Sequence, residues 1–122
     1  PELVEIVDRA IKEKKYAKAR FYARKVGDTR LEKQVTRAQG IDLLKQKKFS
    51  QARLKFQSIG DDAAVQTCYQ NQIHQLHQKI KNDRTLKDYR QHKSVLKKMK
   101  SLAYKAGNHE VEEFCSKVLG QL

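Results

Sequence analysis

Two fifteen-residue stretches of the chain align without a gap at an offset of 33 residues. Residues 14–28 read KKYAKARFYARKVGD, and residues 47–61 read KKFSQARLKFQSIGD. The identical positions are Lys14/Lys47, Lys15/Lys48, Ala19/Ala52, Arg20/Arg53, Gly27/Gly60 and Asp28/Asp61. A period of this length is typical of arrays in which each helical hairpin buries its apolar side against its neighbours. The repeat therefore predicts an all-α, solenoid-type fold.

Apolar residues follow helical spacing through most of the chain. Leu3, Ile6, Val7, Ala10 and Ile11, for example, fall on one stripe of a helix. The chain holds only five Gly and one Pro, too few for the many turns of an all-β fold. The spacing predicts about seven antiparallel helices, over residues 2–14, 16–26, 29–46, 49–59, 62–81, 86–106 and 109–120.

Residues that end and begin helices stand between these segments. Gly27, Gly60 and Gly107 suit the left-handed position after a helix, and each is followed by an Asp or Asn that can cap the next one. Thr85 with Asp88 three residues later resembles a capping box. Helical hairpins with short turns follow from this arrangement.

The spacing of large and small residues in the second helix of each predicted hairpin is distinctive. An aromatic residue opens it, and alanine follows three positions later. The two sets are Tyr16, Ala19, Ala23 and Val26, and Phe49, Ala52, Phe56 and Ile59. In the helix before the second set, Gly40 and Leu43 hold a small and a large apolar position.

This pattern resembles the tetratricopeptide family. The resemblance implies that the small residues let the two helices of a unit approach closely, while the larger ones fill the seam between units. It covers about the first 60 residues, as units 2–27 and 29–60. Beyond them we expect a longer, irregular hairpin over 62–106 and a terminal helix over 109–120.

The departures from the family pattern concern the ends of the units. Gly-Asp replaces the proline that usually closes a repeat, and a weak third copy over 109–120 has Glu112 at the alanine position. The chain begins at Pro1 with the pattern already running by Leu3, which favours a segment of a larger protein.

The net charge of +13 points to acidic partners. Basic residues concentrate in residues 9–25 and 84–105, each with eight basic residues and one acid. Arg90, Lys93, Lys97 and Lys100 are predicted to form a row along one helix edge, which could follow a phosphate backbone. A solvated face is the simpler interpretation. The candidate binding residues are Lys14, Lys15, Lys18, Arg90, Lys93, Lys97, Lys98 and Lys100.

Chemistry-bearing motifs are scarce. His74 and His77 share a helix face, but no further ligand nearby completes a metal shell. No nucleotide-binding loop or catalytic motif occurs, so the sequence predicts neither enzyme activity, cofactor nor metal. Val4 and Asp8 occupy positions where some family members grip a C-terminal carboxylate with Lys and Asn, so no such partner is implied.

The sequence thus favours a non-catalytic scaffold that binds another protein or an adjoining domain of the same chain. The alternative is a basic accessory module that binds an RNA or DNA backbone or an acidic protein surface. Cys68 and Cys115 lie on apolar helix faces, which favours reduced thiols in the cytoplasm or nucleus. No segment approaches the length of about 20 apolar residues needed to span a membrane.

Overall fold

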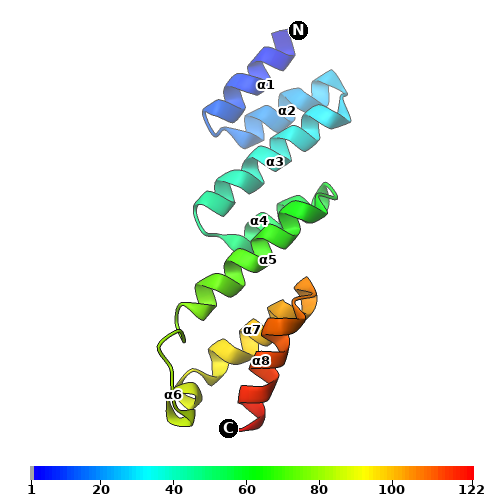
Figure 1. The fold of residues 1–122 in the computed structure, drawn as a ribbon. Helices are drawn as coiled ribbons and strands as arrows, with labels where there is room; N and C mark the ends of the chain where they lie inside the picture. Colours follow the sequence, from blue (N-terminus) through cyan, green and yellow to red (C-terminus); the bar gives the residue numbers. More distant parts are fainter. Residues whose placement is uncertain (1) are drawn as a thin grey trace. The chain divides into compact units, whose positions relative to one another are not determined.

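The computed structural model describes residues 2–122, and the secondary structure of this part of the chain consists of helices, without a strand (Figure 1). The all-α prediction is therefore confirmed. The described residues form eight helices: α1 (Glu2–Lys12), α2 (Tyr16–Val26), α3 (Thr29–Lys45), α4 (Phe49–Ser58), α5 (Asp62–His77), α6 (Leu86–Gln91), α7 (Lys93–Ala106) and α8 (His109–Gly120). None of these helices is both long enough and apolar enough to cross a lipid bilayer.

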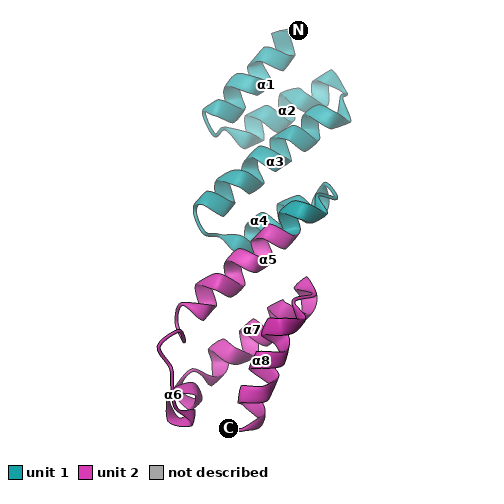
Figure 2. Ribbon diagram, viewed as in Figure 1, with its two compact units in different colours: residues 1–65 teal, residues 66–122 magenta. Residues whose placement is uncertain are grey.

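The chain divides into two compact units, residues 1–65 and residues 66–122 (Figure 2). In the first unit, helices that follow one another in sequence pack together, α1 on α2, α2 on α3 and α3 on α4. In the second unit, α7 packs on α8. Both units therefore contain neighbouring helices joined by short turns.

The three glycines predicted to follow helices adopt the expected left-handed backbone. Gly27, Gly60 and Gly107 all have positive φ, between 71° and 75°. The carboxylate of Asp28 then accepts a hydrogen bond of 2.9 Å from the backbone N–H of Arg30, which caps α3. Asp61 and Asn108 accept equivalent bonds at the starts of α5 and α8. Left-handed glycine followed by a capping side chain is thus a recurrent turn in this chain.

The turn inside each of the first two hairpins is also the same at an offset of 33 residues. Lys14 and Lys47 have φ of 60° and 61°, unusual for residues other than glycine. The N–H of Lys15 donates to the carbonyl of Ala10 at 2.8 Å, and that of Lys48 donates to Leu43 at 2.9 Å. The turns of α1–α2 and α3–α4 therefore match in dihedral angles and in hydrogen bonds.

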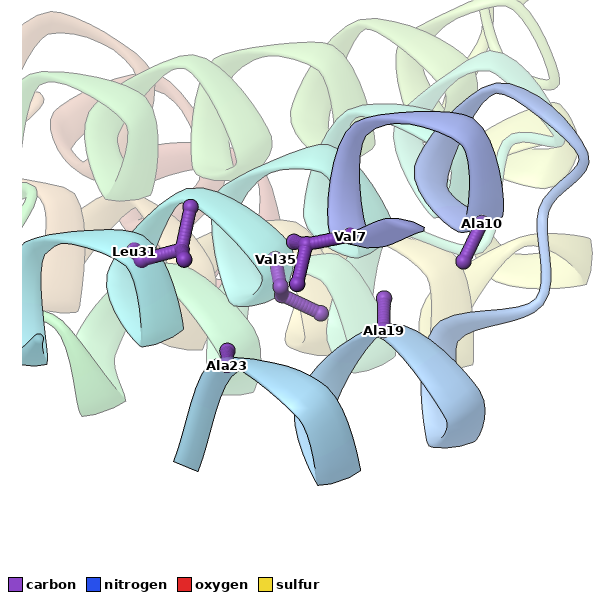
Figure 3. Packing of buried hydrophobic residues seen from close by; sticks show 6 residues of the cluster. All are labelled: Val7, Ala10, Ala19, Ala23, Leu31 and Val35. Carbon is purple, nitrogen blue, oxygen red and sulfur yellow. The ribbon is translucent and has the colours of Figure 1, made fainter. Parts of the chain in front are cut away.

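In the first hairpin the larger of two facing residues is on the first helix, whereas in the second hairpin the larger one is on the second helix. Val7 of α1 points toward α2, where Ala19 and Ala23 face it (Figure 3). At the positions 33 residues later, α3 has Gly40 and α4 has Phe56, whose ring fills the space over the glycine. Each hairpin thus pairs one larger and one smaller residue between its first and second helices.

Most residues predicted to pack within the hairpins are buried. Ala19, Ala23, Gly40, Phe49, Ala52 and Phe56 are buried, and Tyr16, Leu43 and Ile59 are half-buried. Val26 differs, because its side chain is 37% exposed. Val26 lies in the last turn of α2, beside an open hollow that Leu3 and Val4 of α1 also border. No side chain therefore covers Val26 on that side.

The long helix predicted over 86–106 is divided in two, which corrects the predicted seven helices to eight in the described part of the chain. His92 has φ −111° and ψ 27°, outside the helical region, and ends α6. Its Nδ1 lies 2.7 Å from Oδ2 of Asp83, in the loop before α6. This contact holds the residue in the bend between the two helices.

The helix predicted over 62–81 is shorter at its C-terminal end and stops at His77. The N–H groups of Lys79 and Ile80 bond to carbonyls three residues earlier rather than four. This tighter turn leads into the loop before α6. At the start of α6, Thr85 and Asp88 form the predicted capping box.

The burial pattern of α2 and α4 recurs in α7 rather than in α8. Leu96, Met99 and Ala103 are buried at the spacing of Tyr16, Ala19 and Ala23, and Gly107 follows at the position of Gly27. In α8, by contrast, the buried residue is Cys115, and Glu112, at the expected alanine position, is only half-buried. The third copy expected over 109–120 is therefore not matched by its burial.

Candidate functional site

The first group of predicted binding residues lies at the turn between α1 and α2. Lys14, Lys15 and Lys18 are all exposed. Lys14 is nevertheless engaged, because its Nζ lies 3.2 Å from Oδ1 of Asp42 on α3. Lys15 has a longer contact of 3.9 Å with Glu13. Lys14 therefore contributes to packing within the first unit as well as to its surface charge.

Asp42 is held by several partners besides Lys14. Burial alone would raise the pKa of this carboxyl, but hydrogen bonds from Lys14, Gln46 and Tyr16 and the charge of Lys14 bring the pKa below its usual value. Burial and the same carboxylate raise the pKa of Tyr16. The cluster ties the first turn to α3 with Asp42 ionised and Tyr16 neutral.

The second group of predicted binding residues lies in the other unit and does not form a single row. Arg90 is on α6, and the bend at His92 separates it from the α7 residues Lys93, Lys97 and Lys100. These three lysines share one side of α7 at spacings of four and three residues. Lys98 lies next to them, about 100° around the helix from Lys97.

The α7 lysines are unpaired within the described residues. Lys93, Lys97, Lys98 and Lys100 are exposed, and none forms an ion pair with a described residue. Lys97 and Lys100 border an open hollow of about 500 Å³ that also includes Tyr104 and Glu112. The ring of Tyr104 is 72% exposed. These four lysines are therefore a positively charged surface beside an exposed ring.

Two exposed apolar residues of the second helices escaped the sequence interpretation. Phe21 on α2 is 53% exposed and Leu54 on α4 is 62% exposed, at matched positions 33 residues apart. Each lies midway between two buried residues of its helix, two positions from either, and this rotation of about 200° turns it away from the core. That spacing was available in the sequence and could have identified both as exposed.

The surroundings of Phe21 are aromatic and basic. Its ring contacts Tyr22 edge to face, with the ring centroids 5.2 Å apart. Nζ of Lys25 lies 4.6 Å from the centroid of the Phe21 ring, within the range of a cation–π contact. Arg20, Arg24 and Lys25 border a hollow of about 550 Å³ beside this ring. The exposed apolar surface is therefore bordered by basic side chains, of which Arg24 pairs with Glu32 at 3.3 Å.

The groups that could carry covalent or metal chemistry are either buried or isolated. Cys68 and Cys115 are buried thiols that are not joined in a disulfide, and burial raises the pKa of Cys115. His74 lies 3.2 Å from Nε2 of Gln78. Among residues 2–122, no three His, Cys, Asp or Glu side chains are arranged to hold a metal ion.

Neither protein-family models, nor curated protein sequences, nor solved structures give a match to this chain.

Proposed function

We propose that this chain is a non-catalytic protein-interaction module, a stretch of tetratricopeptide-like α-solenoid within a larger protein. The observation that carries the proposal is the agreement between the α1–α2 and α3–α4 hairpins. At an offset of 33 residues they have the same left-handed lysine and the same hydrogen bond in the turn. Each also pairs a larger and a smaller residue between its two helices. Consecutive hairpins that match in this way are the building units of solenoid scaffolds.

The burial pattern of α7 supports a third copy with an enlarged turn. Gly107 lies 47 residues after Gly60, which is 14 more than one repeat. The loop after α5 and the short α6 would then hold the additional residues, and α7 would be the second helix of this copy. Insertions of this kind occur in repeat proteins at the turns, where they leave the packed helices unchanged.

The first helices of the two matched hairpins provide the expected binding face. Val4 and Asp8 of α1 correspond to Arg37 and Ile41 of α3. Val4 is 37% exposed and Ile41 is 42% exposed, so this face offers apolar contacts and charges of both signs. Its partner is another protein or an adjoining domain, inside the cell, where the buried thiols remain reduced.

Affinity capture from cell extract, followed by quantitative mass spectrometry, tests this function. Bait with both Val4→Glu and Ile41→Glu is compared with the wild-type chain, and Leu86→Glu is the matched control because Leu86 is an exposed apolar residue of the other unit. We expect a protein that the wild type and the control capture equally and that the double variant loses at least tenfold. Equal capture by all three baits would contradict the proposal.

The alternative function is binding to an RNA or DNA backbone through Lys93, Lys97, Lys98 and Lys100. The specific observation in its favour is that these four exposed lysines have no acidic partner among the described residues. Lysines of this kind release counterions from the phosphates they approach, which gives an affinity that falls steeply with salt.

A further inference from the structure

The second helices of the matched hairpins present a surface of their own. Phe21 and Leu54 occupy the same position in the repeat, and both point away from the alanines that pack against the first helices. A large apolar side chain that is exposed at one position is ordinary in a protein surface. Its recurrence at the same place in both copies gives a paired apolar feature.

The charged residues that α2 and α4 themselves place around Phe21 and Leu54 are all basic, and one of them, Arg24, pairs with Glu32 of α3. Helix α2 contains four basic residues and no acidic residue, and α4 contains two basic residues and no acidic one. Lys18, Lys25 and Lys55 form no ion pair with any part of the chain that the structure describes. We refer to Phe21, Leu54, Lys18, Lys25 and Lys55 as the α2–α4 face.

Hollows lie beside both apolar residues. The one at Phe21 is bordered by Ala17, Arg20 and Lys25. The one at Leu54 has a volume of about 400 Å³ and is bordered by Leu43, Gln51 and Lys55. Both hollows lie within the unit of residues 1–65. Each provides room for a side chain of a partner next to an apolar contact.

We propose that the α2–α4 face binds an acidic, amphipathic segment of a partner protein. Two apolar side chains of that segment contact Phe21 and Leu54, and its carboxylates face Lys18, Lys25 and Lys55. Charge complementarity determines the sign of the partner, and the paired apolar contacts determine its amphipathic pattern. The inference rests on the proposed function, because the repeat is what places the two contacts on one side of the module.

Other anionic partners fit this face less well. Leu54 has no ring on which a nucleic acid base could stack, and bases stack on aromatic side chains. A membrane surface is bound by a wider apolar side of a helix, with several large residues in the bilayer interface. This face has one exposed apolar residue on each helix beside basic residues, and an acidic peptide with two apolar side chains complements it.

Selection from a random 16-residue peptide library displayed on phage, with the whole chain as target, tests this inference. Enriched peptides are synthesised with a fluorescent label, and their binding is measured by anisotropy. The test variant combines Phe21→Ser with Leu54→Ser, and Leu86→Ser is the control because it also removes an exposed apolar residue. Circular dichroism of each variant verifies that its helix content is unchanged.

We expect enriched peptides that contain several Asp or Glu and at least two large apolar residues. Their Kd should rise at least tenfold with the test variant and remain within twofold with the control. Poly(U) RNA and vesicles of phosphatidylserine and phosphatidylcholine form two further arms. Binding of either that depends on Phe21 and Leu54, in the absence of such peptides, would overturn the inference.

Two outcomes separate this inference from the proposed function. Peptides whose binding survives the test variant but is lost with the Val4→Glu and Ile41→Glu variant overturn the α2–α4 face and support the first-helix face. Absence of any enriched peptide also overturns the α2–α4 face, while the capture experiment with whole proteins decides independently whether the module binds a partner.

Discussion

The aromatic ring of Phe56 lies against the backbone of Gly40, so closely that a Cβ atom on Gly40 would stand 2.8 Å from Cζ of the ring. Phe56 is 2% exposed, so its ring has little room to retreat. The corresponding positions of the first hairpin hold Val7 and Ala23, both fully buried. The contact between α3 and α4 thus depends on the absence of a side chain at one residue and on a large ring at the other.

Replacement of Gly40 by alanine should therefore destabilise the protein. Alanine is favoured over glycine in a helix by about 1 kcal/mol, but an extra carbon in a filled core costs about 1–3 kcal/mol. We expect a net loss of about 1 kcal/mol in the free energy of unfolding, measured by urea denaturation. A gain in stability would show that the Phe56 ring moves aside freely.

A double substitution should transplant the packing of the first hairpin into the second. Phe56→Ala alone leaves a cavity and should cost about 3–5 kcal/mol. The combination of Gly40→Val and Phe56→Ala recreates the pair Val7 and Ala23, and it should be more stable than Phe56→Ala alone by about 1 kcal/mol. The free energy of unfolding is measured by urea denaturation for each single variant and for the double variant. If the loss in the double variant equals the sum of the two single losses, the hairpins do not pack alike.

The left-handed backbone at Lys47 should be relieved by glycine. Its φ of 61° costs a residue with a side chain about 1 kcal/mol, whereas glycine adopts it without strain. After the larger entropy of glycine in the unfolded chain is subtracted, Lys47→Gly should raise the stability by about 0.5 kcal/mol. Lys33→Gly, in the middle of α3, is the control and should lower it by about 1 kcal/mol. Thermal melting, monitored by circular dichroism, shows whether each variant is more or less stable than the wild type.

The capping box at the start of α6 should respond to both substitution and pH. Removal of the Thr85 hydroxyl by Thr85→Ala should cost about 1 kcal/mol. Hydrogen bonds from the backbone N–H groups of Arg84 and Thr85 lower the pKa of Asp88. Because the pKa is lower in the folded state, the stabilisation is present above about pH 4 and is lost as the pH falls through the folded value.

Melting curves at pH 5 and pH 2.5 test this pH dependence. The wild type should lose more stability between the two conditions than Asp88→Asn, which has no carboxyl group at this position. Other carboxylates titrate equally in both proteins, so the difference between them isolates Asp88. Equal losses of stability in the wild type and in Asp88→Asn would show that the charge of Asp88 does not stabilise the folded protein.

If the α7 lysines bind a phosphate backbone, the affinity should fall steeply with salt. Four contacts to a single strand predict a loss of about 50-fold between 50 and 200 mM salt. Joint substitution of Lys97, Lys98 and Lys100 by glutamate should weaken the binding of poly(U) at 50 mM salt by at least tenfold and leave helicity nearly intact. Substitution of the same three lysines by arginine keeps the positive charge and serves as the control. An RNA affinity below detection at 50 mM salt would eliminate this alternative.

Local sequence patterns were sufficient to predict most helices and their ends. The Gly-Asp pairs at 27–28 and 60–61 and the capping box at Thr85 act within one helical turn, so their residues specify the geometry directly. Helix α2 was predicted at residues 16–26, as the structure has it. The burial of Ala19 and Ala52 also followed from the pattern.

Features that depend on contacts between distant residues were predicted less well. The bend at His92 involves Asp83, nine residues away in a loop. The apolar spacing of 86–106 is interrupted at Lys93 but still favours one continuous helix. Arg90 was therefore placed in a row with lysines from which the bend separates it. The burial spacing that α7 shares with α2 and α4 was not anticipated, because Leu96 stands where the earlier helices have Tyr16 and Phe49. The left-handed backbone of Lys14 and Lys47 was not anticipated either, since lysine rarely adopts it.

The reciprocal sizes of the residues in the two hairpins also determine which helices can be partners. If α1 folded against α4, Val7 would meet the ring of Phe56 and overfill the interface. If α3 folded against α2, Gly40 would meet Ala23 and leave a void. Each mismatch is disfavoured by packing alone, although the turn sequences are nearly identical. The sizes of these four residues thus favour the pairing of each helix with the other helix of its own hairpin during folding.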